Sequence, residues 1–155
     1  IVTTITYRKP ILQDIPSMQH LVAPEILSGV ILARSDDEIA TNIRSYTLAM
    51  DGDKLVGFCA LHIHSPKLAE VRSMIIDSQY RGMNIGSSLI EKVSIEGKAL
   101  GLSEILALTY QQQFFERLGF IVIPKESIPE HKIWADCIKC KHFPICNEVS
   151  LIKTL

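Results

Sequence analysis

The hydrophobic and polar positions of the chain repeat in two ways, every second residue in some segments and every third or fourth residue in others. The first pattern is typical of β-strands and the second of amphipathic helices. Alternating or continuous apolar runs predict strands at residues 3–7, 46–50, 54–64, 70–76, 105–108, 120–123 and 149–152. Helical spacing predicts helices that start at residues 14 and 35, and two more over 85–100 and 111–118. This order predicts an α/β chain (α+β) with one mixed sheet and helices packed on it.

Capping and turn residues set the boundaries of these elements. Asp14 is expected to cap the first helix, and Pro24 to end or bend it. Asp51-Gly52-Asp53 lies between two strand-like runs and predicts a β-hairpin. The length of 155 residues fits one domain over residues 1–155, with a Cys-containing C-terminal segment at 131–155.

The charge balance argues against several classes of partner. The chain has 16 basic and 17 acidic residues and a formal net charge of −1. A nucleic-acid protein usually has a basic domain or stripe, and a protein of anionic membranes has basic clusters, so we expect neither partner. The first ten residues lack the apolar region of a signal peptide. We therefore expect a cytoplasmic protein with reduced thiols, and a homodimer is compatible with the sequence.

Three of the four cysteines gather near the C-terminus. The spacing Cys137-x-x-Cys140-x5-Cys146, with His131 before it and His142 inside it, partly matches a zinc knuckle. The second half of such a site would hold one cysteine and a poorly spaced histidine. Buried thiols packed under Trp134, or a redox pair, explain the spacing as well, so the role of these cysteines stays open.

The segment Arg81-Gly82-Met83-Asn84-Ile85-Gly86-Ser87 joins a predicted strand to the long helix. The first amides of a helix have no helical partner and can bind a phosphate, which the helix dipole also favours. Gly82 and Gly86 permit close backbone approach, and Asn84 suits a positive φ. Arg81 adds a cation at the mouth. An ordinary tight turn is the alternative, and the loop matches neither the NTPase nor the dinucleotide-binding pattern.

The motif Arg81-Gly82-x-x-Ile85-Gly86, placed after the strand at 71–77, resembles the acetyl-CoA signature of the GNAT N-acetyltransferases. Residues 114–120 resemble the second signature of that fold. Further segments resemble the short, single-domain amino-acid N-acetyltransferases similar to N-acetylglutamate synthase; they are residues 31–35, 68–73, 108–109, 132–140 and 146–148. Two departures are Asn84, at the usual middle glycine, and Phe115, where many GNAT enzymes hold a catalytic Tyr.

The resemblance implies a GNAT fold, with a mixed central β-sheet whose strands splay apart and are flanked by helices, and acetyl-CoA as cosubstrate without a metal. The backbone of Met74, Ile75 and Ile76 would contact the pantetheine arm, and an N–H near Ile76 would polarise the thioester. The pyrophosphate would be held at the loop, by Arg81, Gly82, Met83, Asn84, Ile85, Gly86 and Ser87.

The acceptor would be a small amino acid, and glutamate is the expected one, which implies a place in arginine biosynthesis. Its amine needs a base, for which we choose Glu70. The alternation of side chains along a strand predicts that one face carries Glu70, Arg72, Met74 and Ile76. Arg34 and Arg72 are the expected carboxylate anchors, and Tyr110 the expected acid for the thiolate.

Each of these assignments has a plainer alternative. Glu70 and Arg72 can form a structural ion pair, Arg34 can be a solvated charge, and Tyr110 can simply end a strand. His62 and His64 alternate on one strand face and offer a proton relay or exposed strand residues. Other functions that fit are acetylation of another small amine or of a protein N-terminus, or a non-catalytic acetyl-CoA-binding or zinc-knuckle module.

Overall fold

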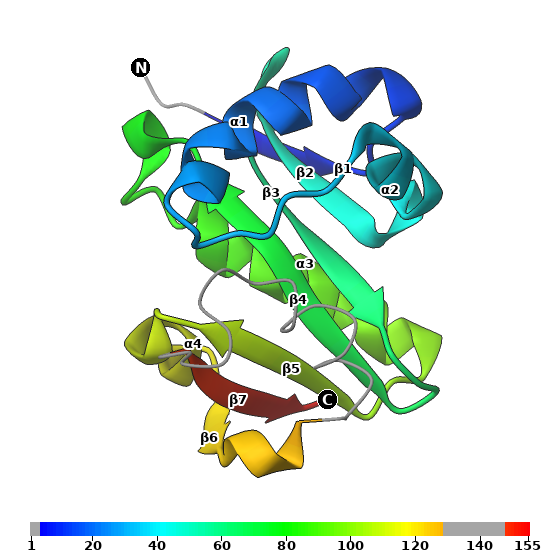
Figure 1. Ribbon diagram of the computed structural model, residues 1–155, viewed down its shortest axis with the longest axis vertical. Coiled ribbons are helices and arrows are strands. Elements are labelled where there is room, and N and C mark those ends of the chain that lie inside the picture. Colours follow the sequence, from blue (N-terminus) through cyan, green and yellow to red (C-terminus); the bar gives the residue numbers. More distant parts are fainter. Residues whose placement is uncertain (1–3, 129–147) are drawn as a thin grey trace.

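A seven-stranded mixed sheet forms the centre of the computed structural model, which describes residues 4–128 and 148–155 (Figure 1). The order across the sheet is β1-β2-β3-β4-β5-β7-β6. The strand bounds are β1 Ile5–Arg8, β2 Tyr46–Asp51, β3 Lys54–Ile63, β4 Leu68–Ile76, β5 Glu104–Thr109, β6 Ile121–Ile123 and β7 Val149–Thr154. Neighbours are antiparallel except β4 and β5, which run parallel. The predicted mixed sheet is thus confirmed.

Helices cover both faces of this sheet. The α-helices are α1 Ile15–Leu27, α2 Asp36–Thr41, α3 Ile85–Leu100 and α4 Gln112–Arg117. One buried cluster joins α3 and α4 to the sheet and includes Leu89 and Phe115. The other joins α1 and α2 to the opposite face and includes Met18 and Ile39. In the described ranges, no helix is long and apolar enough to cross a membrane.

The predicted hairpin and the predicted C-terminal strand are both present. Gly52 has a φ of +61° in the turn between β2 and β3, a value that glycine adopts without steric cost. The last strand, β7, lies between β5 and β6 and is antiparallel to both. A β-strand therefore follows the cysteine-rich segment and completes the sheet.

The start and end of α1 differ from the sequence expectation. The carboxylate of Asp14 does not cap the helix; it accepts two hydrogen bonds from Arg8, each 2.9 Å long, and one from the backbone N–H of Ile11. The Arg8 guanidinium holds the pKa of Asp14 below its usual value. Pro24 does not end the helix, which continues to Leu27. Its missing N–H removes one i→i−4 hydrogen bond from the helix without ending it.

An extra residue in β4 changes which side chains share a face. Phe58 pairs with Ile75 and Ala60 with Arg72, so two residues of β4 oppose the single Cys59 of β3. This is a β-bulge, and within it Ser73 has a φ of 52°.

The bulge makes the predicted alternation wrong beyond Arg72. Met74 and Ile76 pack with the α3 cluster, and Ile75 packs with the α1 cluster. Arg72, in contrast, lines a pocket with Tyr46, on the α1 side. Glu70 and Arg72 therefore lie on the opposite face from Met74 and Ile76.

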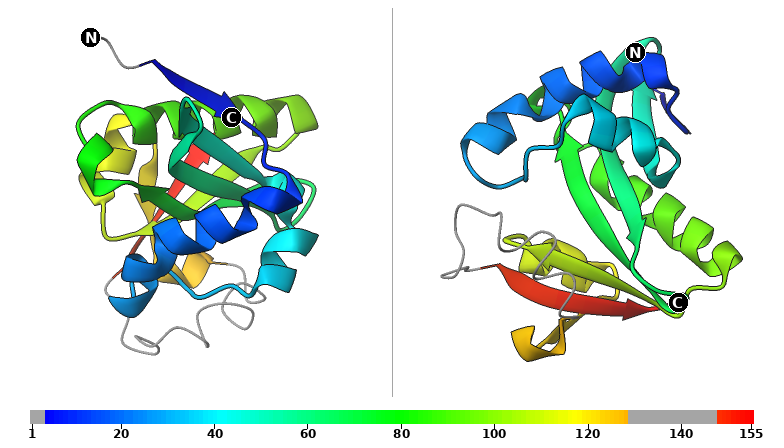
Figure 2. Two further views of the ribbon diagram at one scale, coloured as in Figure 1. Left: turned by 90° about the horizontal axis from the view of Figure 1, so that it is seen from above. Right: turned by 45° about the vertical axis from the view of Figure 1, so that its right-hand side comes forward.

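The parallel pair β4 and β5 separates along its length. Their pairing covers residues 68–71 of β4 and 104–107 of β5, and the two strands diverge beyond it (Figure 2). The backbone of β4 from Arg72 onward is therefore not bonded to β5. The predicted splayed strands are confirmed, and the splay begins where the bulge begins.

Candidate active site

The turn before α3 holds a left-handed residue at its centre. Asn84 has φ 60° and ψ 20°, and Gly82 has φ +82°. The expectation that Asn84 serves a positive φ is confirmed. Asn84 makes no side-chain cap, and the first backbone hydrogen bond of the helix runs from Ser88 N to Asn84 O at 3.0 Å. The amides of residues 85–87 thus have no partner within the helix and are placed to bind an anion.

Gly86 leaves room for an aromatic ring. A Cβ at this position would lie 3.2 Å from Cζ of Phe114 in α4, which is tighter than ordinary van der Waals contact. Phe115, expected to stand where many family members carry a Tyr, is a core residue, 4% exposed and stacked edge-on with Phe114 and Phe120. The ring that faces the loop is therefore Phe114.

Arg81 is the cation at the mouth of the loop. Its side chain is 67% exposed, and its Nη2 lies 4.0 Å from Oε1 of Glu25 in α1. Met83 is also exposed. The loop therefore presents a positive side chain and helix amides beside the diverging edge of β4.

Glu70 is buried among basic groups on the face of the sheet that α1 and α2 cover. Its Oε1 lies 2.9 Å from His64 Nε2 and accepts a 3.2 Å hydrogen bond from Arg72 Nε. The Glu70 side chain is 3% exposed, and that of His64 is 2% exposed. The ring of His62 is 4.9 Å from that of His64, centroid to centroid. A buried carboxylate of this kind needs hydrogen-bonded partners to remain charged.

A small pocket brings together the two predicted anchors. Arg34, just before α2, and Arg72 of β4 both line it, together with Glu38, Tyr46, His62 and Ser73. Gln19 of α1 donates a 2.8 Å hydrogen bond to the backbone oxygen of Arg34, which holds this segment against the helix. Burial raises the pKa of Tyr46, while the nearby charges of Arg34 and Arg72 act in the opposite direction. The pocket therefore carries cationic groups suited to carboxylates.

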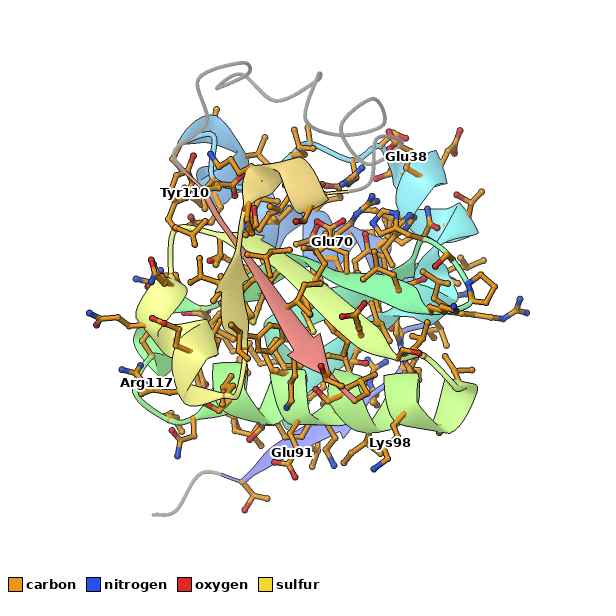
Figure 3. The ribbon with its side chains drawn as sticks, turned by 90° about the horizontal axis from the view of Figure 1, so that it is seen from below. Glu38, Glu70, Glu91, Lys98, Tyr110 and Arg117 are labelled. Atoms are coloured by element: carbon orange, nitrogen blue, oxygen red, sulfur yellow. The ribbon has the colours of Figure 1, made fainter. Side chains whose placement is uncertain are left out.

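Tyr110 directly follows β5 and is 40% exposed. Figure 3 shows Tyr110, Glu70 and Glu38 on the side of the sheet away from α3, which carries Glu91 and Lys98. Glu70 and Tyr110, the two residues predicted for proton transfer, thus share one side of the sheet with Glu38.

The cysteine motif at 137–146 lies outside the described residues, as do His131 and Trp134. Within residues 4–128 and 148–155, no group of three His, Cys, Asp or Glu side chains is placed to hold a metal ion. Cys59 of β3 is fully buried, and burial raises the pKa of its thiol to about 12. That thiol is therefore protonated at neutral pH and is a poor nucleophile.

Comparison with known families adds to this geometry. Residues 42–122, from β2 into β6, match the family model described as "Acetyltransferase (GNAT) domain". The chain belongs to the GNAT acetyltransferases. It is an N-acetyltransferase, and acetyl-CoA is the cosubstrate of these enzymes.

Individual relatives and structures agree with this family. An uncharacterized N-acetyltransferase of Chlorobaculum tepidum is 33% identical over 144 residues, 93% of this chain and 92% of that protein. The amino-acid acetyltransferase of an Enterobacter species is 25% identical over 127 residues, and this chain spans 29% of its length. The crystal structure of N-acetylglutamate synthase from Neisseria gonorrhoeae, with coenzyme A and N-acetyl-glutamate, has a TM-score of 0.88 at 20% identity; the match covers all of this chain and 36% of that one.

Sequence reasoning missed several parts of this GNAT site. It did not foresee the bulge at Ser73 and Met74, because the apolar run after Arg72 also fits an uninterrupted strand. Tyr46 and Glu38 were assigned to a strand and to a helix start, and only the tertiary fold brings them to the pocket of Arg34 and Arg72. The wrong alternation beyond Arg72 was itself the available signal, because it placed apolar Met74 and Ile76 beside buried charges.

The left-handed conformation of Asn84 generates a stability prediction. Asn84→Ala should lower the free energy of unfolding by about 1 kcal/mol, because a Cβ without a local hydrogen-bonding group is disfavoured in this region. The free energy of unfolding of Asn84→Gly should stay within about 0.5 kcal/mol of the wild-type value. Glycine adopts a positive φ without steric strain, but it loses more backbone entropy on folding. Urea unfolding without coenzyme measures both. An alanine variant as stable as the glycine variant would contradict the assigned backbone.

Proposed function

We propose that the chain transfers the acetyl group of acetyl-CoA to the α-amine of a small amino acid, with L-glutamate as the first candidate. The observation that carries the proposal is the pocket shared by Arg34 and Arg72. Glutamate has two carboxylates, and a guanidinium group binds a carboxylate through paired hydrogen bonds. The names of the amino-acid acetyltransferases among the relatives, and the fold shared with N-acetylglutamate synthase, support the same acceptor class.

In the proposed reaction the acceptor ammonium first loses a proton to Glu70, directly or through a water molecule. The neutral nitrogen attacks the thioester carbonyl carbon, so that a C–N bond forms and the C–S bond then breaks. A backbone N–H near Ile76 stabilises the negative charge that develops on the carbonyl oxygen. Tyr110 donates a proton to the leaving thiolate, and its phenolate then takes up the second proton that the attacking nitrogen loses as the amide forms.

His64 and Arg72 position Glu70 in this proposal, because both contact its Oε1. His62 lines the acceptor pocket and stacks edge-on against His64. A second route for the proton therefore runs from the acceptor through the two histidines to Glu70, since imidazole exchanges protons near neutral pH. The alternative without a catalytic role is that the cluster only stabilises the sheet.

For the donor, we assign the pyrophosphate of acetyl-CoA to the amides of residues 82–87 and to Arg81. The pantetheine arm is assigned to the backbone of Met74, Ile75 and Ile76. Support comes from the diverging edge of β4, whose backbone is not bonded to β5 along this stretch, and from the helix amides that have no helical partner beside it.

We place the proposed enzyme in the cytoplasm, at the acetylation step of arginine biosynthesis. Residues 1–155 act as a single catalytic domain in this proposal, with small-molecule substrates and neither nucleic acid nor membrane as partner. A homodimer is compatible with it. Support for a single domain comes from the sheet, in which the strand nearest the C-terminus lies between two earlier strands.

The acceptor can be identified by release of free coenzyme A thiol in the presence of acetyl-CoA and a panel of amino acids, polyamines and peptide N-termini. Glutamate should give the highest kcat/KM. N-acetyl-glutamate should give no thiol release, because its amine is already acetylated. Turnover with peptides or polyamines but with no free amino acid would contradict the proposal.

Arg72→Ala should raise the KM for the amino acid roughly ten- to hundredfold, the cost of losing a charged hydrogen-bonding partner. The KM for acetyl-CoA should change far less, because Arg72 lies on the α1 side of the sheet. Arg117→Ala, which removes an exposed guanidinium from α4, serves as the control. Equal increases of both KM values would remove Arg72 from the acceptor site.

Gly86→Trp should abolish acetyl-CoA binding, because an indole at the first turn of α3 would cover the amides assigned to the pyrophosphate. Gly86→Ala, whose methyl group requires a shift of a few tenths of an ångström from Phe114, should keep most of the affinity. Calorimetry with acetyl-CoA measures binding, and thermal melting shows whether each variant is folded. A folded tryptophan variant with unchanged affinity would refute the loop assignment.

A further inference from the structure

Glu38 has two fixed contacts at the edge of the acceptor pocket. Its backbone N–H donates to Ser35 Oγ at 3.1 Å, and its Oε1 accepts from the Ser35 backbone N–H at 3.3 Å. These two hydrogen bonds form a capping box, which fixes the start of α2. The other carboxylate oxygen, Oε2, lies 4.0 Å from Nη1 of Arg34. The cap thus holds a negative charge beside one of the two acceptor-binding guanidinium groups.

Both arginines of the pocket have an internal carboxylate beside them. Arg72 contacts Glu70, and Arg34 lies next to Glu38. The other titratable side chains that line the pocket are Tyr46 and His62. Within the described residues, two positive charges are therefore balanced by two negative charges when His62 and His64 are neutral.

This balance has a consequence for the charge of the acceptor. An amino acid with an uncharged side chain is a zwitterion and adds no net charge to the pocket. A second carboxylate bound by Arg34 adds a negative charge and lies close to Glu38. Two like charges a few ångströms apart repel, and water and salt reduce that repulsion only in part where the group is half exposed. The Glu38 side chain is 52% exposed.

We propose that Glu38 determines specificity by weakening the binding of acceptors with a second carboxylate relative to acceptors with a neutral amide in its place. The inference rests on the proposed function and refines its substrate class. Glutamate and glutamine are the matched pair of acceptors, because they differ in this one group. Glu38 is not a catalytic residue in this proposal, because it acts only through charge and through the position of Arg34.

The test is Glu38→Gln, which removes the charge and keeps the capping box, since glutamine serves at this position as glutamate does. The ratio of KM for glutamate to KM for glutamine should fall about three- to tenfold, mainly through a lower KM for glutamate. The matched control is Asp37→Asn, which removes the same charge from the same helical turn without lining the pocket. That control should leave the ratio unchanged.

Salt provides a second readout that a purely structural role would not move. Raising the ionic strength should raise the same KM ratio in Glu38→Gln, because it screens the attraction between Arg34 and the second carboxylate. It should raise the ratio less in the wild-type enzyme, because it also screens the repulsion from Glu38. The KM for acetyl-CoA should be the same in both proteins.

The outcomes separate this inference from the proposed function. If the KM ratio in Glu38→Gln equals that of the wild type, or if Asp37→Asn changes the ratio as much as Glu38→Gln does, the role of Glu38 is overturned. The proposed function is not affected by either result. An increase of both KM values together would mean that Glu38 only positions Arg34, and would overturn it too. If calorimetry showed that neither amino acid binds the wild-type protein, with or without coenzyme A, the proposed function would fail and the inference with it.

Discussion

One inserted residue in β4 determines how the rest of the site is arranged. The bulge opposite Cys59 turns the strand, so that Arg72 faces α1 while Met74 and Ile76 pack against α3. The left-handed conformation of Ser73 costs roughly 1–2 kcal/mol for a residue with a side chain. Apolar burial accompanies that cost, because Met74 and Ile76 pack with the α3 cluster and Ile75 packs with the α1 cluster.

The same distortion explains why the sheet opens where it does. Parallel strands stay paired only while their backbones run side by side, and β4 leaves β5 after Val71, one residue before the bulge region. Arg72, Ile75 and Ile76 of β4 thus pair with β3, and residues 72–76 have no register partner in β5. Their free edge lies next to the turn that begins α3, whose amides also lack helical partners. Two sets of backbone groups are therefore available for a ligand, and neither depends on a particular side chain.

Local patterns in the sequence were enough to predict most of the elements. Periodicity placed the strands and the long helix, and Asp51-Gly52 and Asn84 were interpreted correctly because a turn and a positive φ restrict the residue type strongly. The prediction that Asp14 caps α1 was wrong, because Arg8, six residues away, binds its carboxylate. The helix also continues past Pro24 to Leu27. The different surroundings of Phe114 and Phe115 were not predicted, since the sequence does not distinguish two adjacent aromatic residues in a short helix.

The pairing of charges in the acceptor pocket follows from its burial. A guanidinium group beside the sheet, as Arg72 is, would be costly without a partner; Glu70 accepts its hydrogen bond, and His64 contacts the same carboxylate oxygen. The partners also restrict the arginine side chains to few rotamers, so less conformational entropy is lost when a carboxylate binds. In the proposed enzyme, the cost of this preorganisation is that each internal carboxylate competes with the substrate for the same guanidinium group. The proposed acceptor site therefore has less affinity than two unpaired arginines would provide, and in return we propose that the balance of charge in the pocket distinguishes one acceptor from another.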